Sequence, residues 1–372
     1  MLTNIIGGRK EFMFTDPEDN STFYGTELLT IGDTSLEQRL SCDYDPSAPP
    51  QIIFTRDFVG TLGGCPDWNC VISEKNEDVP RAGAIVTYMG SNAKSYSAQS
   101  DQYLIHYSQE SPIYTPYTEN TTAFNMTLGF SHDSPITSPY GYTVRLAEKS
   151  RRSLTRKELN IINGKTKEAA WFVSHCDTSS GRFEYYAELQ KYIPVDVFGT
   201  CGTLRCNRGT ECENQLDTTY HFYLSFENSM CNYYMTEKLW KHGYMHLVVP
   251  VVLRRSIVEP FVPPYSFLAV DDFSSPKELA EYMYYLIANK TAYLEYFKWR
   301  SDYRVVFLNG ENHNNAERPW GLCQLCRLLW ETPRKRYQID IEARFFQTCE
   351  EKPILDLLPP VSRFNYSKLL RS

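Results

Sequence analysis

The sequence predicts an α/β protein whose residues 170–290 form a doubly wound parallel sheet. Short apolar segments that are typical of buried strands alternate there with segments of helical spacing. A capping box, Ser275 to Glu278, has proline at the first helical position and begins a helix through Leu279 and Met283. The length of 372 residues is too large for one small core and allows a second domain.

The first part of the chain is less regular. Residues 1–50 are polar and turn-rich, and we expect them to form a loosely ordered arm. Residues 110–142 are rich in Pro, Ser, Thr and Tyr, which predicts loops over a first domain. The charged stretch 148–157 is the best linker candidate, although a solvated helix face explains it equally well. Strands are predicted at 51–54, 84–88 and 102–107.

The second part of the chain alternates strands and helices. Helices are predicted at 182–192, at 235–245 and from Ser275 onward. Because ligands in doubly wound sheets bind beyond the carboxyl ends of the strands, near helix N-termini, we expect a ligand site there. The apolar strands are predicted at 171–174, 195–198, 221–226, 248–253 and 267–270.

Cysteines and glycosylation sequons indicate the compartment. The chain has 11 cysteines, and their clustering is typical of cross-linking in an oxidising lumen. An odd number leaves at least one thiol free or paired between chains. Cys323 and Cys326 have CxxC spacing, but no second CxxC accompanies them, so structural disulfides are favoured over a zinc site or a redox pair. Sequons, which favour a glycosylating lumen, begin at Asn20, Asn120, Asn125, Asn289 and Asn365.

Charge and hydropathy exclude several classes of partner. The net charge of −7 argues against binding of nucleic acid or anionic lipid through overall electrostatic attraction, so any anion site is expected to be local. No apolar run approaches the ~18–20 residues of a transmembrane helix. The N-terminus also lacks a signal-peptide core, so we expect the chain as given to be soluble and a targeting or anchor segment to be missing from it.

Most common catalytic motifs are absent. The sequence contains no GxGxxG, P-loop, GxSxG or HExxH. Asp43-Tyr44-Asp45 matches a DxD metal-binding pattern, but three residues in a polar arm are weak support and no metal role is assigned to them. The seven histidines are scattered, and each is interpreted as structural.

Lys238 indicates where a local anion site could lie. Residues 221–240 predict a strand, a short aromatic loop and a helix that begins near Met235. A cation in the first turn of a helix is mildly repelled by the helix dipole, by ~0.5 kcal/mol. A bound phosphate would reverse this repulsion, because backbone amides and the lysine would face it together. The alternative is a lysine whose ammonium simply reaches solvent.

Several motifs occur in the order of a known family. FENSMCNYYMTEKLW is followed by VVPVVL, FVPPYSFLAVDDF, ELAEYM and YFKWR, and is preceded by QESPIYTP, NMTLGFSHDSPITSPYG and AAWFVSHCDTSSGRFEYYAELQKYIPVDVFGTCG. Over roughly residues 60–330 the chain therefore closely resembles the α1,3-fucosyltransferases of glycosyltransferase family ten. GCPDWNC, VSHC with CG downstream, and WGLCQLC are most similar to the invertebrate, particularly nematode, branch that fucosylates the chitobiose core of N-glycans.

The resemblance implies an α/β fold of GT-B type, with two Rossmann-like domains facing a cleft and a disulfide-fastened C-terminal tail. It also implies that Cys65 and Cys70 pair with Cys323 and Cys326. The expected organisation is a polar arm at 1–50, an acceptor domain at 51–155, a GDP-fucose-binding domain at 156–319 and a cysteine-bearing tail at 320–372 that returns to the first domain.

The resemblance further implies roles for single residues. Glu110 in GlnGluSerPro matches the general base, and Arg182 in SerGlyArgPhe matches the arginine on the donor pyrophosphate. One base suffices for inversion, and the low pKa of the departing GDP removes the need for a protein acid, although its charge calls for cations. The remaining donor contacts are matched by Asn228, Tyr234, Glu237 and Lys238, with the lysine on phosphate and the glutamate on sugar hydroxyls.

We therefore expect a Golgi-luminal α1,3-fucosyltransferase that uses GDP-fucose on GlcNAc of the N-glycan core. The alternatives are a Lewis-type enzyme that acts on Galβ1,4GlcNAc antennae and an inactive, glycan-binding relative. No essential metal or cofactor is expected, and manganese or magnesium would only stimulate. The expected partners are GDP-fucose and an N-glycan or glycoprotein acceptor, without nucleic acid, and with a membrane only through an anchor absent from this chain.

Overall fold

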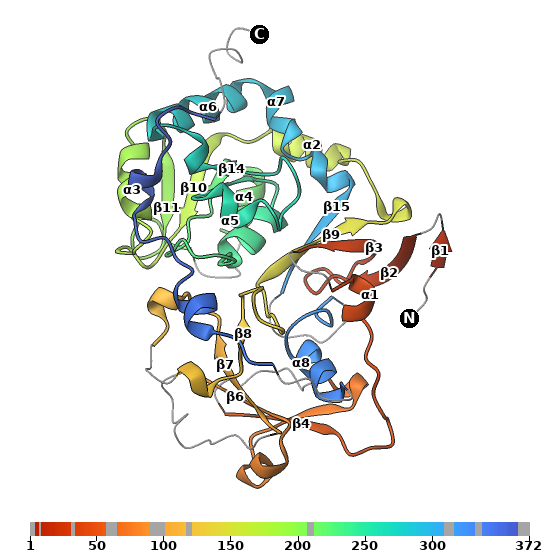
Figure 1. Ribbon diagram of the computed structural model, residues 1–372. Helices are drawn as coiled ribbons and strands as arrows, with labels where there is room; N and C mark the ends of the chain where they lie inside the picture. The colour runs from red at the N-terminus through yellow and green to blue at the C-terminus, as the bar shows by residue number, and fades with distance from the viewer. Residues whose placement is uncertain are drawn as a thin grey trace. The chain divides into compact units, whose positions relative to one another are not determined.

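The computed structural model describes residues 4–6, 9–30, 34–56, 65–88, 101–116, 121–206, 212–308, 316–331 and 337–363. The chain divides into two compact units (Figure 1). The first unit comprises Met1–Tyr140, Cys231–Tyr233 and Leu308–Cys349, and the second comprises Gly141–Met230, Tyr234–Phe307 and Glu350–Ser372.

The first unit contains a parallel sheet with the strand order β5-β4-β6-β7-β8. Apolar side chains of the strands, among them Ile53, Val86 and Ile105, pack against leucines of helix α8 (Gly321–Trp330). The three strands predicted for this part are present as β4, β6 and β7. Two strands are additional, β5 and β8, and β8 lies within the segment predicted as loops. The strands are β4 (Gln51–Thr55), β5 (Cys70–Ser73), β6 (Ala84–Thr87), β7 (Tyr103–Ser108) and β8 (Met126–Gly129).

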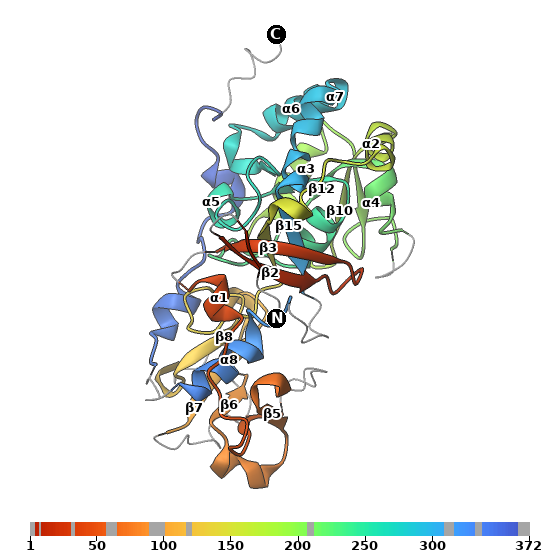
Figure 2. The same ribbon diagram turned by 90° about the vertical axis from the view of Figure 1, so that its right-hand side faces the viewer.

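The N-terminal segment corrects the expectation of a loosely ordered arm. It forms strands β1 (Asn4–Ile6), β2 (Arg9–Thr15) and β3 (Thr22–Leu29), which pair antiparallel in sequence order, and the short helix α1 (Leu36–Arg39). Phe12, Phe14 and Phe23 are buried, and the rings of Phe14 and Phe23 stack 5.2 Å apart. The alternation of buried phenylalanines therefore outweighs the polar composition. Figure 2 shows the adjacent strands β2 and β3 of this hairpin.

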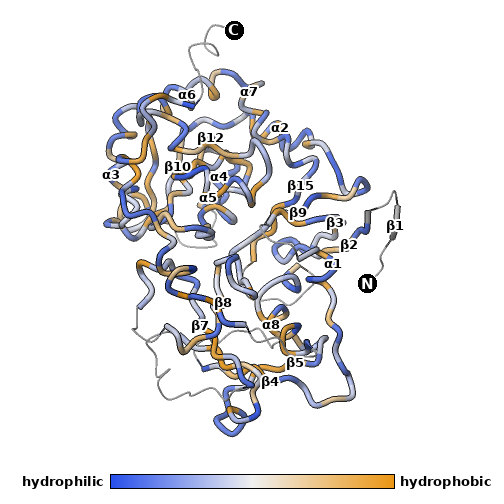
Figure 3. The backbone as a smooth tube through the Cα atoms, viewed as in Figure 1, coloured by the Kyte–Doolittle hydropathy of each residue, from blue (hydrophilic) through white to orange (hydrophobic). Residues whose placement is uncertain are grey.

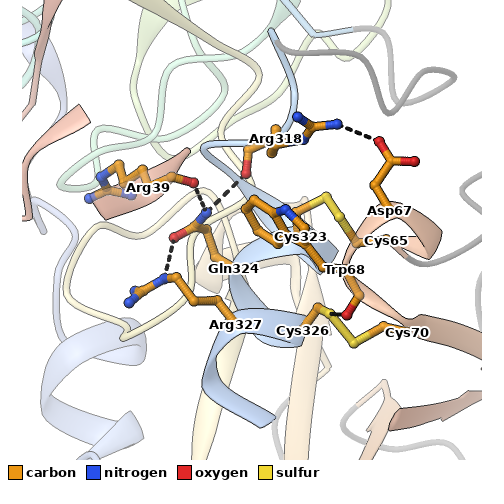
Figure 4. The surroundings of a disulfide bond; sticks show 10 residues. All are labelled: Arg39, Cys65, Asp67, Trp68, Cys70, Arg318, Cys323, Gln324, Cys326 and Arg327. Carbon is orange, nitrogen blue, oxygen red and sulfur yellow. Dashed lines mark hydrogen bonds and ion pairs between the residues drawn. A yellow bond between two sulfur atoms is a disulfide. The ribbon is translucent and has the colours of Figure 1, made fainter. Parts of the chain in front are cut away.

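Two disulfides fasten α8 to the region around β5, as the resemblance implied. Cys65 pairs with Cys323, and Cys70 pairs with Cys326. Beside them, the buried Gln324 side chain donates to the backbone oxygens of Arg39 (2.8 Å) and Arg318 (2.9 Å) (Figure 4). Helix α8, which carries the two cysteines, is therefore part of the core of the first unit and is also fastened to it by disulfides.

The second unit contains another parallel sheet, with the strand order β11-β10-β12-β13-β14. The five strands predicted for this part are present: β10 (Lys167–Phe172), β11 (Val195–Phe198), β12 (Tyr220–Leu224), β13 (Val249–Val252) and β14 (Leu268–Ala269). Figure 3 shows hydrophobic residues concentrated along the strands of the parallel sheets. This unit is the doubly wound sheet that the alternation of elements predicted.

Helices cover the two faces of this sheet (Figure 1). Tyr185 and Leu189 of α3 (Arg182–Leu189) share an apolar core with Leu279 and Met283 of α6 (Pro276–Ala288). The opposite face carries α4 (Gln215–Thr218) and a π-helix, η7 (Lys238–Met245). The other helices of the unit are α2 (Arg156–Asn163), α5 (Arg255–Val258) and α7 (Lys290–Glu295).

Helix starts follow the capping signals of the sequence. Ser275 accepts a hydrogen bond from the Glu278 N–H, although the Glu278 carboxylate accepts from Ser274 instead of closing the box. Thr155 and Glu158 do form a reciprocal capping box at α2. The charged stretch 148–157, a candidate linker, therefore ends in a helix start and lies within the second unit.

Strands β9 (Gly141–Leu146) and β15 (Tyr303–Phe307) of the second unit pair antiparallel.

Three further disulfides link Cys176 to Cys201, Cys206 to Cys212, and Cys231 to Cys349. Cys42 forms no disulfide in the described structure, which accounts for the odd count. Within the same described ranges, every helix is too short or too polar to span a bilayer.

Candidate functional site

Loops at the carboxyl edge of the second unit's sheet hold most of the predicted site residues. The order of the strands reverses at β10, because the chain continues to β11 on one side and then crosses to β12 on the other. Ligands of such sheets bind outside the strand ends at this switch point. The loop after β10 leads to Arg182, and the loop after β12 leads to Lys238.

Lys238 lies at the first position of η7 and is surrounded by acceptors. Its Nζ atom lies 3.0 Å from Thr236 Oγ1, 3.2 Å from Glu237 Oε1 and 3.3 Å from Glu227 Oε2. Its side chain is only 17% exposed. The ammonium is therefore held in a polar cluster, and the interpretation of a lysine that simply reaches solvent does not describe its position.

Glu227 organises this cluster and was not predicted from the sequence. Its buried carboxylate accepts from the backbone N–H of Thr236 (2.7 Å) and from the Thr236 hydroxyl (2.9 Å). Burial raises the pKa of Glu227, although Lys238 opposes that shift. The sequence signal was available, because Glu227 follows directly on the end of an apolar strand.

Lys238 and Glu237 stabilise each other's charged forms. Burial acts to raise the pKa of Glu237, but the charge of Lys238, hydrogen bonds and His242 together outweigh it, and the net shift is downward. Burial acts to lower the pKa of Lys238, but Glu227 and Glu237 outweigh it and the net shift is upward. Lys238 is therefore a permanent cation, and Glu237 is an ionised carboxylate able to accept hydrogen bonds.

Arg182 begins α3 and is 2% exposed. Its guanidinium donates to the backbone oxygens of Phe226 (2.7 Å) and His175 (2.6 Å), so it joins the loops that follow β12 and β10. Gly181 before it has φ +65°, and a Cβ there would lie 2.6 Å from Pro353. Arg182 therefore holds the loops after β10 and β12 together, and its contact with a donor pyrophosphate stays a prediction.

Asn228 and Tyr234 are both buried in the loop after β12. The Asn228 backbone oxygen accepts from the Ser180 N–H (3.2 Å), and its Oδ1 accepts from the Ser229 hydroxyl (3.1 Å). Tyr234 lines a cavity at the carboxyl ends of β12 and β13. The structure thus brings these two residues and the Lys238 cluster into one stretch of the loop, and their donor contacts stay predictions.

Arg254 is a second cation beside this cavity and was not predicted from the sequence. It follows β13, lines the cavity with Glu227 and Leu253, and forms ion pairs with Asp271 and Glu350, each at 3.1 Å. A basic residue directly after a predicted apolar strand was the signal that could have found it.

Glu110 lies in the first unit, just after β7, with an exposed side chain. Its Oε1 accepts from the Ser111 N–H (2.8 Å), and its backbone oxygen accepts from the Thr115 hydroxyl (3.3 Å). The loop therefore holds this carboxylate at the carboxyl edge of the first unit's sheet. Its role as a base stays a prediction.

The remaining candidates fall at scattered positions. Asn20 is exposed in a turn, Asn125 Nδ2 donates to Gln338 (2.9 Å), and Asn289 Oδ1 caps α7 at Ala292 (3.1 Å). Asn120 and Asn365 lie outside the described residues. Asp45 of the DxD triplet accepts from Ser47 (2.6 Å), as a local turn residue does.

Comparisons with known proteins identify the family of the chain. The chain matches the family described as "Fucosyltransferase, N-terminal" over residues 48–141 and "Glycosyltransferase family 10 (fucosyltransferase) C-term" over residues 162–344. It is 46% identical to Alpha-(1,3)-fucosyltransferase fut-1 of Caenorhabditis elegans over 360 residues, which are 94% of this chain and 82% of that protein. Glycoprotein 3-alpha-L-fucosyltransferase A of Drosophila melanogaster is 40% identical over 207 residues, 55% of this chain and 41% of that protein.

A solved structure shares the fold. The crystal structure of an alpha1,3-fucosyltransferase with GDP-fucose superposes with a TM-score of 0.51 at 18% identity, covering 82% of this chain and 98% of that chain. With its two parallel Rossmann-like sheets, the α/β fold expected for this chain is confirmed. The chain therefore belongs to the fucosyltransferases of glycosyltransferase family 10.

Proposed function

We propose that this chain is an inverting α1,3-fucosyltransferase that moves L-fucose from GDP-β-L-fucose to a GlcNAc of the N-glycan chitobiose core. The observation that carries the donor half is the cluster of Lys238, Glu227 and Glu237 beside the cavity at the carboxyl ends of β12 and β13. A cation held at a helix start between two carboxylates is suited to exchange one of them for a phosphate oxygen.

The donor contacts follow from that exchange. As phosphate approaches Lys238, the Glu237 carboxylate loses its 3.2 Å ion pair and becomes available to sugar hydroxyls. Glu227 stays in place because Thr236 donates two hydrogen bonds to it. Negative charge grows on GDP as it departs, so Lys238 stabilises the transition state more than the ground state.

The acceptor half rests on Glu110. Inversion in one displacement needs one base to take the proton from the attacking hydroxyl, and an exposed carboxylate fixed by its own loop supplies that base. The leaving GDP needs no protein acid. We propose that the donor chemistry needs no essential metal. Lys238 provides positive charge at the phosphate, and the buried guanidinium of Arg182 adds to it.

The acceptor and compartment are proposed from the relatives and the cysteines. Identity is 46% to the nematode protein and 40% to the Drosophila glycoprotein 3-alpha-L-fucosyltransferase, against 34% to the human 4-galactosyl-N-acetylglucosaminide 3-alpha-L-fucosyltransferase FUT6. This order favours the N-glycan core over galactosylated antennae. Five disulfides favour an oxidising compartment, for which we propose the Golgi lumen.

Products from a panel of defined N-glycans test the proposal. GDP-fucose is supplied with a glycan that carries the chitobiose core and no galactose, and separately with free Galβ1,4GlcNAc. Mass spectrometry and linkage analysis should find one fucose, α1,3-linked to core GlcNAc, in the first reaction only. Fucose only on Galβ1,4GlcNAc would establish the Lewis-type alternative, and GDP-fucose binding without transfer to either acceptor would establish the inactive relative.

A further inference from the structure

Glu213, His242 and His246 form a cluster of metal-ligand type on the face of the second unit's sheet that carries η7. One potential ligand atom from each residue lies within 4.8 Å of those from the other two. His242 lies in η7, His246 is the capping residue directly after it, and Glu213 lies two residues before α4. The donor chemistry proposed above uses none of these three residues.

An aspartate orients one of the imidazoles. His246 Nδ1 lies 2.9 Å from Asp217 Oδ2, and the other oxygen of that carboxylate accepts from the Leu247 N–H (2.6 Å). With Nδ1–H donated to Asp217, the Nε2 atom of His246 carries a lone pair. Histidines that bind metals in proteins almost always donate their other ring N–H to a carboxylate or carbonyl in this way.

His242 provides a second, independent observation. Its side chain is 8% exposed, and among the described residues its buried Nδ1 atom has no hydrogen-bond partner. The ring is fixed by aromatic contacts, with centroids 5.1 Å from Phe172 and 5.6 Å from Tyr223. Leaving a buried polar atom without a partner is costly, so such an atom in a native fold calls for an explanation.

We propose that Glu213, His242 and His246 bind one divalent transition-metal ion of the zinc class, with water as a fourth ligand. Two imidazole nitrogens and one carboxylate suit Zn²⁺, whereas Mg²⁺ and Ca²⁺ prefer sets of six or more oxygens. Zinc bonds of about 2.0–2.1 Å place tetrahedral ligands roughly 3.4 Å apart. Side chains now within 4.8 Å therefore reach the ion by small rotations.

Lys241 competes with the ion. Its ammonium lies 3.0 Å from Glu213 Oε2, and its side chain is 27% exposed, so it can turn to solvent when a metal replaces it. The ion would link η7 to the segment after Cys212, which the disulfide to Cys206 already restrains. Zinc is expected to stabilise the unit without entering the transfer reaction, in agreement with a donor site that needs no metal.

Calorimetric titration of Zn²⁺ into tag-free, EDTA-treated protein tests the site. The wild type should bind one Zn²⁺ per chain at micromolar or lower concentration and should not bind Mg²⁺ there. His242→Phe keeps the aromatic packing and Glu213→Gln keeps the shape, and each should weaken binding at least about tenfold. Asp217→Asn removes only the orienting carboxylate and should weaken it by about 10–100-fold.

His221→Phe is the matched control, because His221 is also 8% exposed in this unit but is bonded through Nδ1 to the Lys167 backbone oxygen (2.8 Å). It should keep zinc binding. Zinc should raise the melting temperature of the wild type and of this control by a few degrees, but not that of Glu213→Gln. No binding by the wild type, or equal binding by all variants, would overturn the proposal; Glu213→Gln and Asp217→Asn decide it even if His242→Phe fails to fold.

Discussion

Replacing Lys238 with methionine separates two roles that this lysine could have, phosphate binding and stabilisation of the fold. Methionine keeps the apolar stem but removes the ammonium that lies 3.3 Å from Glu227 and 3.2 Å from Glu237. A loss of activity in this variant alone would be ambiguous, because a buried carboxylate would also lose its partner. A second substitution, Glu227→Gln, removes that unpaired charge.

The size of the stability loss follows from burial. The side chains of Lys238 and Glu227 are 17% and 11% exposed, so the pair is mostly buried. Removing one partner of a buried pair costs about 3–5 kcal/mol. Because burial already raises the pKa of Glu227, protonation of this carboxyl relieves part of that cost, and we expect about 3 kcal/mol. In Glu227→Gln/Lys238→Met, Thr236 keeps an oxygen acceptor, so the free energy of unfolding should return to within about 1 kcal/mol of wild type.

Denaturant unfolding and GDP titration calorimetry measure the two roles separately. A charge-assisted hydrogen bond contributes about 1.5–3 kcal/mol, so losing the one to phosphate should weaken GDP binding by about 10–150-fold. This loss should be the same in Lys238→Met and in the double variant. GDP affinity should also become less sensitive to ionic strength in both.

The double variant decides between the two roles. If it recovers GDP affinity together with stability, Lys238 serves only to balance Glu227, and its assignment to phosphate is wrong. If it recovers neither, the buried pair is not the reason for the instability, and the account of this cluster fails.

Three further outcomes are expected. Glu110→Gln should keep GDP affinity and the fold but lose ~10²–10⁴ in turnover, with a flattened acid limb of the pH–rate profile; near-normal turnover in a transfer assay would contradict its role as base. Cys70→Ser/Cys326→Ser should lower the free energy of unfolding by about 2 kcal/mol, which is the low end for a disulfide, because the Cys65–Cys323 bridge closes nearly the same loop. An unchanged denaturant midpoint would count against this prediction. Burial lowers the pKa of His106 to about 4, so between about pH 6.5 and pH 4 the unfolded chain binds a proton that the folded chain does not. The free energy of unfolding should therefore fall by up to about 3 kcal/mol over this pH range. His106→Phe should flatten that slope in acid-unfolding curves, and an unchanged slope would disprove the contribution of His106.

The alternation of strands and helices was predictable because apolar strands and capping residues are local signals. The doubly wound sheet of the second unit follows from them, as does the start of α6 at Ser275. The N-terminal hairpin was not predicted, because its buried Phe12, Phe14 and Phe23 are spread through a segment of polar composition. Strand β8 was missed because it lies within a segment rich in Pro, Ser, Thr and Tyr, which predicts loops.

Site residues were predictable where a charge conflicted with its local context. Lys238 at a helix start is such a conflict, and the structure resolves it with Glu227 and Thr236. The buried position of Arg182 depends on backbone oxygens of two loops that follow different strands, and no local pattern reports that packing. The HxxxH spacing of His242 and His246 is a local signal, but Glu213 joins them only when the segment before α4 meets the end of η7.

Amide hydrogen exchange with and without GDP tests the central claim most directly, because it locates the donor on the intact chain. GDP should slow exchange at the carboxyl edge of the second unit's sheet. Protection should cover residues 225–239 and the start of α3 at Arg182, while strands β2 and β3 of the first unit keep their exchange rates. GDP-dependent protection confined to segments outside the loops after β10, β12 and β13 would contradict the account.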